Sequence, residues 1–385
     1  MIIKIPKEWG VHREPRTPKA YRKDIITHGF AYEDIFDWDT LFNDALYLGE
    51  GRVLLVGSPL YELKRLINFE ANGKKVKHSF HDITNVTLTL VETDAKELVI
   101  RHPKKDLVIK VNDLCQDFDG LGCITTMQKN EPIEWIEKWV RYYYTEHDVR
   151  GFTIYDNNST NYTVEELQNR LDSLNLDGAI VKVIDWCVPK GPNTPQWDSS
   201  FAQFTAFEHS KYKYMWCAKF TLNHDIDEYL VLRDRTIHDI AEELTSKGVG
   251  ALRYKSRNID PYNEKLGVSA HTLEPADRKV QDYYYYSEYN NTDNTVIEQR
   301  VFTKWVVIPE YAMEYQWRVH DFWGVNDAIE VPISSGIYFA HMYALQSRHK
   351  DFHVCFHDRN KQLVELSKLT KDTLLETKLR SVFDE

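Results

Sequence analysis

Two aspartates one residue apart, Asp225 and Asp227, follow an apolar and aromatic run that begins at Trp216, and a second apolar run then continues to Leu232. This pattern predicts a buried strand that ends in a turn holding both carboxylates, with a second short strand leaving it. Two carboxylates at a strand end can share a divalent cation, and Mg²⁺ and Mn²⁺ prefer oxygen ligands and leave positions open for phosphate oxygens. The stretch therefore predicts a site for a nucleotide diphosphate.

The same triplet occurs twice more in the chain, at Asp37/Asp39 and at Asp117/Asp119, and neither copy follows such an apolar run. Aspartate commonly serves turns, so a solvated turn is the alternative interpretation of any single triplet. The interpretation of Asp225 and Asp227 as ligands depends on the elements around them.

Strands and helices alternate from Leu121 onward. We expect strands at residues 122–127, 151–155, 179–184, 249–254 and 304–308 and helices at residues 132–146, 164–174, 200–212 and 236–247. Residues 163–166 have the form of a capping box at the start of one helix. Such alternation is typical of βαβ units and a mainly parallel sheet.

Polar clusters follow three of the expected strands, at residues 128–131, 156–159 and 224–228. In α/β sheets of this kind, ligands bind at the carboxyl ends of the strands. We therefore expect the three clusters to lie at one edge of the sheet and to form one site.

Five segments, in this order, resemble glycosyltransferases of the GT-A fold, with the greatest likeness to glycosyltransferase family 92 and its bacterial relatives. They are TMQKNEPIEWIEKWVRYYYTEHDVRGFTIYDNNST, Gln203 before a stretch rich in Lys and Tyr, FTLNHDIDEYLVL, KWVVIPEYAMEYQWRVHDF and YFAHMYA, and they span residues 120 to 345. The resemblance implies an α/β, Rossmann-like GT-A fold whose mainly parallel sheet is flanked by helices. It also implies the inverting transfer of a sugar from a nucleotide diphosphate donor, a UDP-sugar, to a glycan, polysaccharide or other hydroxyl acceptor.

The resemblance further implies which residues form the site. The nucleotide-binding residues would be Lys129, Asn130, Glu131, Asp156, Asn157, Ser159 and Asp225. The divalent cation, Mn²⁺ or Mg²⁺, would be held by Asp225, Asp227 and His341. Asp156 would accept a hydrogen bond from the uracil imide or the ribose, and turn formation is its alternative role. A satisfied core histidine is the alternative for His341.

Other residues would assist the reaction. Glu228 is expected to orient the acidic turn, because carboxylates next to metal ligands commonly support them. His320 is expected to contact the diphosphate or the acceptor, or to pack. Inversion requires a carboxylate that takes the proton of the acceptor. The candidates for this base are Asp260, Glu264 and Asp321, and a solvated surface acid is the alternative for each.

The sequence divides into three parts. Residues 1–118 contain short β-type runs between turns rich in Gly, Asn, Asp and Lys, which predicts a β-rich accessory region whose first 45 residues wrap over another surface. Residues 119–350 are the expected GT-A domain, with a polar excursion at residues 255–300. Residues 351–385 are charged and are expected to form a helical tail.

Composition restricts the class of protein. The net charge of −11 argues against general affinity for nucleic acid. The chain has no apolar run near the roughly 18 residues that a membrane span needs and no signal-peptide layout, so we expect a cytoplasmic protein without a transmembrane segment. Five cysteines without a Cys-x-x-Cys motif indicate reduced thiols.

Two other functions stay open on the sequence alone. The first is a non-catalytic glycan-binding or scaffold protein on the same fold, and the intact acidic residues Asp225 and Asp227 argue against it. The second is a nucleotidyltransferase, a class that usually carries a Gly-rich, basic loop near its first strand. Residues 128–131 do not form such a loop.

Overall fold

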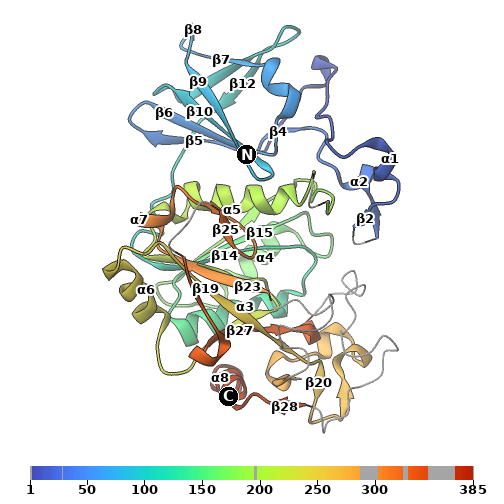
Figure 1. Ribbon diagram of the computed structural model, residues 1–385, viewed down its shortest axis with the longest axis vertical. Helices are drawn as coiled ribbons and strands as arrows, with labels where there is room; N and C mark the ends of the chain where they lie inside the picture. The colour runs from blue at the N-terminus through green and yellow to red at the C-terminus, as the bar shows by residue number, and fades with distance from the viewer. Residues whose placement is uncertain are drawn as a thin grey trace.

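The computed structural model describes residues 2–27, 29–194, 197–286, 302–323, 328–345 and 369–384. Residues 351–368 of the expected tail and residues 287–300 of the expected excursion lie outside the described residues. Figure 1 shows two parts, a β-rich part that contains the N-terminus and an α/β part that contains the C-terminus. Within the described residues, no helix is both long and apolar enough to span a membrane.

The α/β part is built on a single sheet, which has nine strands among the described residues. The strands are β14 (Gly122–Gln128), β15 (Gly151–Asp156), β16 (Ile180–Asp185), β17 (Phe220–Asn223), β18 (Glu228–Leu232), β19 (Ala251–Ile259), β23 (Thr303–Val307), β26 (Ile329–Val331) and β27 (Ile337–Met342). Their order is β16-β15-β14-β17-β23-β19-β27-β18, and β26 also pairs with β19. The first four strands in this order are parallel to one another. The expected α/β fold with a mainly parallel sheet is confirmed.

Four helices share one hydrophobic core with this sheet. They are α3 (Ile133–His147), α4 (Val164–Asp172), α6 (Ile237–Ser246) and α8 (Thr373–Phe383). Thr163 and Thr236 form capping boxes at the starts of α4 and α6, which explains why these helices begin where the sequence predicts. Leu375 and Leu379 of α8 are fully buried in the same core, so this helix is part of the α/β packing.

The β-rich part has two larger sheets, with strand orders β13-β5-β6-β10-β9 and β12-β11-β7-β8. Two small two-stranded sheets join β1 (Ile3–Lys4) to β4 (Thr40–Phe42) and β2 (Ile26–Thr27) to β3 (Phe30–Ala31). The strands of the two larger sheets are β5 (Asp44–Gly49), β6 (Arg52–Gly57), β7 (Asn68–Ala71), β8 (Lys74–Lys75), β9 (His78–Ile83), β10 (Val86–Glu92), β11 (Glu97–Arg101), β12 (Leu107–Lys110) and β13 (Asn112–Asp113). The pairs are antiparallel except that β13 runs parallel to β5. The domain boundary at residue 118 stays a prediction.

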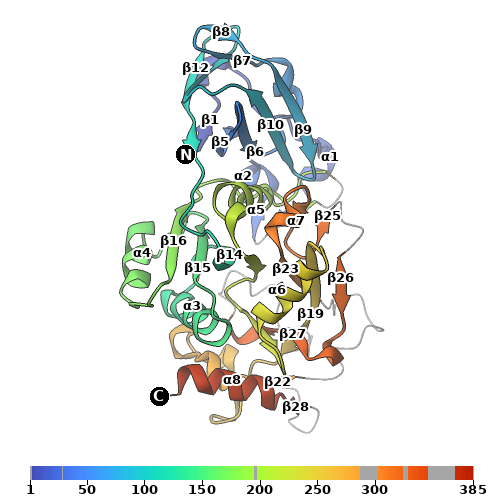
Figure 2. The same ribbon diagram turned by 90° about the vertical axis from the view of Figure 1, so that its left-hand side faces the viewer.

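Helix α5 (Phe201–Lys213) lies between the two parts (Figure 2). Its Phe204 and Tyr212 pack against Leu54 and other apolar residues of the β-rich part. Its Phe207 packs into a cluster with Trp305 of the central sheet. One helix therefore covers a sheet of each part.

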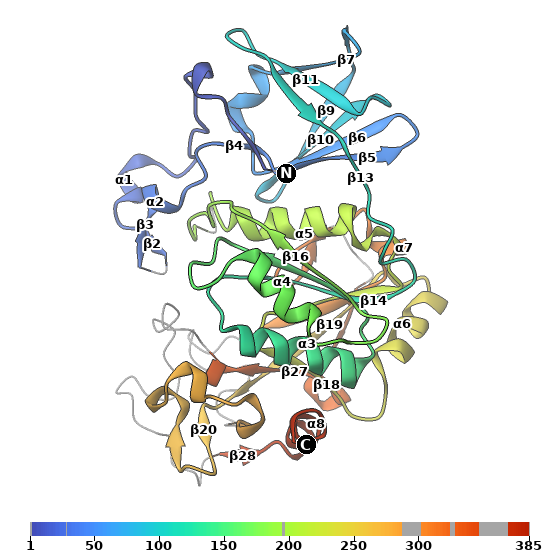
Figure 3. The same cartoon turned by 180° about the vertical axis from the view of Figure 1, so that it is seen from behind.

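A segment near the N-terminus, residues 13–38, lies over the loop that follows β16 (Figure 3). It contains the short helices α1 (Lys19–Arg22) and α2 (Tyr32–Ile35). Asp198 of the loop is fully buried and accepts hydrogen bonds from the backbone N–H of Thr17 at 2.8 Å and from the hydroxyl groups of Tyr32 and Tyr61, both at 2.7 Å. We call residues 13–38 the N-terminal arm.

Candidate active site

The three polar clusters follow strands whose carboxyl ends lie at one edge of the sheet. β14 pairs in parallel with β15, with Gln128 opposite Asp156, and also with β17, with Thr125 opposite Asn223. The clusters after β14 and β15 are joined directly, because Gln128 Nε2 donates to Asp156 Oδ2 at 2.6 Å and the N–H of Asn130 donates to Ser159 Oγ at 2.8 Å. The first two clusters thus form one hydrogen-bonded surface beside the acidic turn.

Asp156 and Asn157 hold this surface together. The second carboxylate oxygen of Asp156 accepts a hydrogen bond from the N–H of Ser159 at 2.9 Å. The amide nitrogen of Asn157 donates to the carbonyl oxygens of Trp186 and Val188, at 2.9 and 2.8 Å. Turn formation, the alternative role considered for Asp156, is therefore visible in its contacts.

The three residues after Gln128 differ in their surroundings. Lys129 is exposed, whereas Glu131 is buried. Asn130 adopts a left-handed backbone with φ of 57°, and its Oδ1 accepts a hydrogen bond from the N–H of Thr160 at 2.7 Å. Asparagine tolerates this conformation better than most residues.

Tyr162 links the same loops and was not found from the sequence. Its hydroxyl lies 2.8 Å from Gln128 Oε1 and 3.0 Å from the carbonyl oxygen of Glu131. Gln128 could be suspected because it ends a strand beside a polar cluster. No local pattern points to Tyr162.

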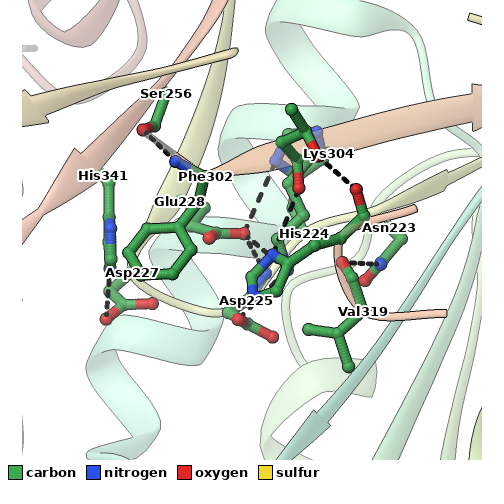
Figure 4. Close-up of polar contacts among 12 residues, drawn as sticks. Asn223, His224, Asp225, Asp227, Glu228, Ser256, Phe302, Lys304, Val319 and His341 are labelled. Atoms are coloured by element: carbon green, nitrogen blue, oxygen red, sulfur yellow. Dashed lines mark hydrogen bonds and ion pairs between the residues drawn. The ribbon is translucent and has the colours of Figure 1, made fainter. Parts of the chain in front are cut away.

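The acidic turn is held by Lys304 from β23 (Figure 4). Lys304 Nζ lies 3.1 Å from Asp225 Oδ2 and 3.0 Å from Glu228 Oε2. Glu228 Oε2 also accepts the N–H of Asp225 at 2.8 Å. Glu228 therefore contacts both the backbone of Asp225 and the lysine that binds Asp225, and its orienting role stays a prediction.

Asp227 faces His341 on the other side of the turn, as Figure 4 also shows. Asp227 Oδ2 and His341 Nε2 are 3.6 Å apart, and the two side chains are 6% and 15% exposed. The antiparallel pairing of β18 with β27 places Glu228 opposite His341, which brings the ring beside the turn. His341 is therefore half-buried next to the strand-end turn and does not lie in a remote part of the core.

The electrostatics of the turn follow from burial and from these ion pairs. Burial by itself would lower the pKa of Lys304, but the carboxylates of Asp225 and Glu228 raise it above its ordinary value. Burial likewise opposes the charged form of His341, and Asp227 outweighs it, so the pKa of His341 is raised. Burial raises the pKa of Glu228, and Lys304 opposes that shift.

His320 is also next to the turn. Its ring stacks on Phe302 with centroids 4.9 Å apart, and the ring of Phe302 stands edge-on to His341 at 5.8 Å. Burial, with the nearby ammonium of Lys304, lowers the pKa of His320 to about 4. His320 is therefore neutral near pH 7. Its Nδ1 donates to the carbonyl oxygen of Thr303 at 3.2 Å, so its Nε2 can accept a hydrogen bond.

The three candidates for the catalytic base lie in different surroundings. Asp260 is buried and directly follows β19, whose Asn258 pairs with His341. Glu264 accepts hydrogen bonds from the hydroxyl groups of Tyr284 and Tyr285, at 2.8 and 2.9 Å. Asp321 is 42% exposed and lies 3.6 Å from Arg318. Strand pairing thus brings Asp260 to the edge that carries His341.

The side chains of the turn supply a small set of donors for a cation. Among the described residues, no group of three or more His, Cys, Asp or Glu side chains is arranged to hold a metal ion. Asp227 offers a carboxylate oxygen, the kind of ligand that suits Mg²⁺ and Mn²⁺, and His341 offers one nitrogen donor. These residues fit a cation that takes its other ligands from water and phosphate, as Mg²⁺ and similar ions do in nucleotide sites.

Comparison with known families identifies the chain. The family model for glycosyltransferase family 92 matches residues 121–380. The chain belongs to glycosyltransferase family 92. It is therefore a glycosyltransferase, and the matched range contains the whole acidic turn and all of helix α8 up to residue 380.

Solved structures give weaker likenesses to this family 92 glycosyltransferase. It is similar to the mannosyltransferase Ktr4p from S. cerevisiae with 12% identity and a TM-score of 0.25, over 40% of this chain and 42% of that chain. It is similar to S. aureus TarS 1-349 with 15% identity and a TM-score of 0.23, over 38% of this chain and 42% of that one. A comparison with curated proteins gave no match.

Proposed function

We propose that this family 92 glycosyltransferase moves a sugar from a UDP-sugar to a hydroxyl group of a glycan or polysaccharide, with the help of Mn²⁺ or Mg²⁺. The observation that supports the proposal most is the pair formed by Asp227 and His341, with its oxygen and nitrogen 3.6 Å apart. Asp227 belongs to the turn after β17, and β17 pairs in parallel with β14, so the turn and the loop after β14 follow neighbouring strands at the same edge. A carboxylate and an imidazole facing each other at such an edge suit a cation bound to a diphosphate.

Each residue of the edge has a distinct part in this proposal. Asp227 and His341 would hold the cation, which when bound stabilises the negative charge that develops on the leaving diphosphate. Asp225 is fixed by Lys304 and remains 29% exposed, so it is available to the ribose or to water around the cation. The surface made by residues 128–131 and 156–162 would bind the nucleoside.

Inversion requires a base on the acceptor side of the sugar. We assign this role to Asp260, because it is buried at the end of β19 beside the strand that carries His341. Glu264 already accepts hydrogen bonds from two tyrosine hydroxyl groups. Asp321 is more exposed than Arg318, its partner in an ion pair. Conversion of a donor of known anomeric form, followed by NMR of the product, distinguishes inversion from retention.

The decisive experiment replaces Asp227 with alanine and measures the release of UDP from UDP-sugars in the presence of Mn²⁺ and acceptor. A carboxylate that holds the cation in the transition state contributes several kcal/mol, so turnover should fall on the order of 10³-fold. A chelator should reproduce this loss in the wild type. Full metal-dependent activity of the Asp227→Ala variant would show that the acidic turn has been misassigned.

The matched control is Asp119→Ala, which changes the last residue of another Asp-x-Asp triplet. Asp119 is exposed, so its replacement should leave both stability and turnover unchanged. Asp37 is unsuitable as a control, because it is fully buried and pairs with Arg13 at 3.0 Å. An equal loss of activity in the Asp119→Ala variant would contradict the proposal that the acidic turn has a specific role in catalysis.

A further inference from the structure

Lys304 is a buried cation between two carboxylates of the acidic turn. Its side chain is 0% exposed, and its ammonium lies 3.1 Å from Asp225 Oδ2 and 3.0 Å from Glu228 Oε2. An ammonium has three N–H donors, and two of them are directed to these oxygens. Lys304 is the first residue of KWVVIPEYAMEYQWRVHDF, one of the segments that resemble family 92. The sequence alone does not indicate a role for it.

The charges of the turn separate into two groups. Lys304 neutralises Asp225 and Glu228, whereas Asp227 faces His341 at 3.6 Å. Without Lys304, three carboxylates within four residues would repel one another at a site where burial weakens the screening by water. The lysine therefore compensates the charge of Asp225 and Glu228, and Asp227 lies against His341 instead.

The position of Lys304 shows that it acts through the turn. Lys304 comes from β23, which pairs with β17 on one side and β19 on the other, so its backbone is held inside the sheet. The Asp225 side chain is 29% exposed, while that of Lys304 is not exposed at all. Asp225 thus stands between the ammonium and the surface that a donor would reach.

We propose that Lys304 is a positioning residue for glycosyl transfer, which holds Asp225 and Glu228 away from the divalent cation and leaves Asp227 and His341 as the side chains that face it. The proposal rests on the function proposed above for the acidic turn. It has a consequence for binding. Two protein donors hold a cation weakly, so the cation binds mainly together with a nucleoside diphosphate, whose oxygens complete its coordination.

The test replaces Lys304 with methionine and measures two quantities. Titration with Mn²⁺ alone should show at least about tenfold tighter binding than in the wild type, because Asp225 is released to join the cation and a nearby positive charge is lost. Turnover of the UDP-sugar should fall on the order of 10²-fold, because the cation and the diphosphate are then misplaced. A role in folding alone would not tighten the binding of Mn²⁺.

Two further variants keep the test decisive if Lys304→Met does not fold. The double variant Lys304→Met/Glu228→Gln removes both buried charges, and it should also bind Mn²⁺ more tightly, by a smaller factor. Lys304→Arg keeps the charge and should retain most of the wild-type behaviour towards Mn²⁺. Arginine also keeps donors for both carboxylates.

The matched control is Lys211→Met. Lys211 is another buried lysine, with its Nζ 2.6 Å from Glu208 Oε2 and with both side chains at most 2% exposed, and it belongs to α5 and not to the acidic turn. Its replacement should lower stability to a similar extent, since it also leaves a buried carboxylate without its cation. Mn²⁺ binding and turnover per folded molecule should not change.

Unchanged or weaker binding of Mn²⁺ in folded Lys304→Met, or in the double variant, would overturn the proposal. Weaker binding of UDP in the absence of metal would also overturn it, because Lys304 would then contact the donor itself. Asp227→Ala separates this failure from failure of the proposed function. If Asp227→Ala is inactive while Lys304→Met leaves Mn²⁺ binding unchanged, the acidic turn is correctly assigned and the role of Lys304 is wrong.

Discussion

Tyr162 is the residue that joins the two loops after β14 and β15, through contacts of its hydroxyl with Gln128 Oε1 and with the carbonyl oxygen of Glu131. In Tyr162→Phe the ring stays and these contacts are lost. We expect the KM for the donor to rise several-fold with little change in kcat, and the free energy of unfolding to fall by about 1 kcal/mol. Steady-state kinetics with varied donor concentration measures the first effect.

The control for this prediction is Tyr144→Phe. Tyr144 donates to the carbonyl oxygen of Asp177 at 3.1 Å, in an exposed position. Its variant should have wild-type KM and kcat. An unchanged KM in Tyr162→Phe would show that the two loops do not contact the donor.

His147 makes the stability of the protein depend on pH. It is buried at the end of α3, its Nε2 lies 2.8 Å from the carbonyl oxygen of Leu230, and burial lowers its pKa to about 3. The unfolded chain takes up a proton below about pH 6.5, which the folded protein resists until near pH 3. The free energy of unfolding is therefore unaffected by the protonation of His147 above pH 6.5. Between pH 6.5 and pH 3 it falls as the pH falls, by up to about 1.4 kcal/mol per pH unit.

His147→Gln should remove that dependence. Denaturant unfolding of both proteins at pH 7 and at pH 5 gives the free energies. The advantage of the wild type over the variant should be smaller at pH 5 by about 2 kcal/mol. An advantage that does not change with pH would mean that His147 is protonated in the folded state.

The local sequence locates the acidic turn but not the partners of its side chains. A pair of aspartates after an apolar run is a local pattern, and both aspartates lie in the turn between β17 and β18. Their roles in binding a cation and a nucleotide stay predictions. The partners of Asp225 and Asp227 are Lys304 and His341, which come from later strands, so only the sheet order brings them together. Asp156 lies in a segment that resembles a nucleotide-binding loop. In the structure, both of its carboxylate oxygens accept hydrogen bonds from within the protein, one from Gln128 and one from Ser159.

At the scale of elements, local signals account for most of the helix positions. Helices α4 and α6 begin at capping boxes, and α3 begins after Pro132, which are all features of a few neighbouring residues. The strand expected at residues 249–254 is longer, at Ala251–Ile259, because it pairs with β23 and β27 in succession. That extension depends on distant strands and has no local signal.

The N-terminal arm gives a prediction about one element. Asp198→Ala removes the acceptor for the hydroxyl groups of Tyr32 and Tyr61 and for Thr17, all in buried or half-buried positions. We expect a loss of roughly 2–4 kcal/mol of stability. Proteases should then cleave more rapidly within residues 13–38, which peptide mapping by mass spectrometry detects.

A comparable aspartate serves as control. Asp94 accepts the hydroxyl of Tyr47 at 2.7 Å in an exposed position, so Asp94→Ala should have almost no effect on either measurement. Equal cleavage of the arm in Asp198→Ala and in the wild type would show that other contacts are enough to hold it.

At the scale of the whole molecule, the two parts are joined by more than the chain between them. His209 of α5 lies 3.0 Å from Asp44 Oδ2 in the β-rich part and 2.8 Å from the hydroxyl of Tyr155 in the central sheet. The connecting segment is itself bound to the α/β part, since the N–H of Cys115 donates to the carbonyl oxygen of Lys213 at 2.8 Å. The change of pattern near residue 118 is visible in the sequence, whereas a helix shared by both parts is not.

Limited proteolysis tests this organisation. Gln116 and Asp117 are exposed and offer a site of cleavage between the parts. We expect the two fragments to elute together in size-exclusion chromatography after such a cut and to separate only in denaturant, because α5 packs against both. Fragments that separate in native buffer would show that the parts are independent.

The shared helix also affects how the protein is made. α5 begins at Phe201, about 90 residues after the last strand of the β-rich part ends at Asp113. A ribosome adds roughly 5–20 residues per second. For several seconds of synthesis, the sheet that contains Leu46, Leu54 and Val56 is therefore not covered by α5. A fragment that ends before residue 201 should emerge with this apolar face open and should self-associate.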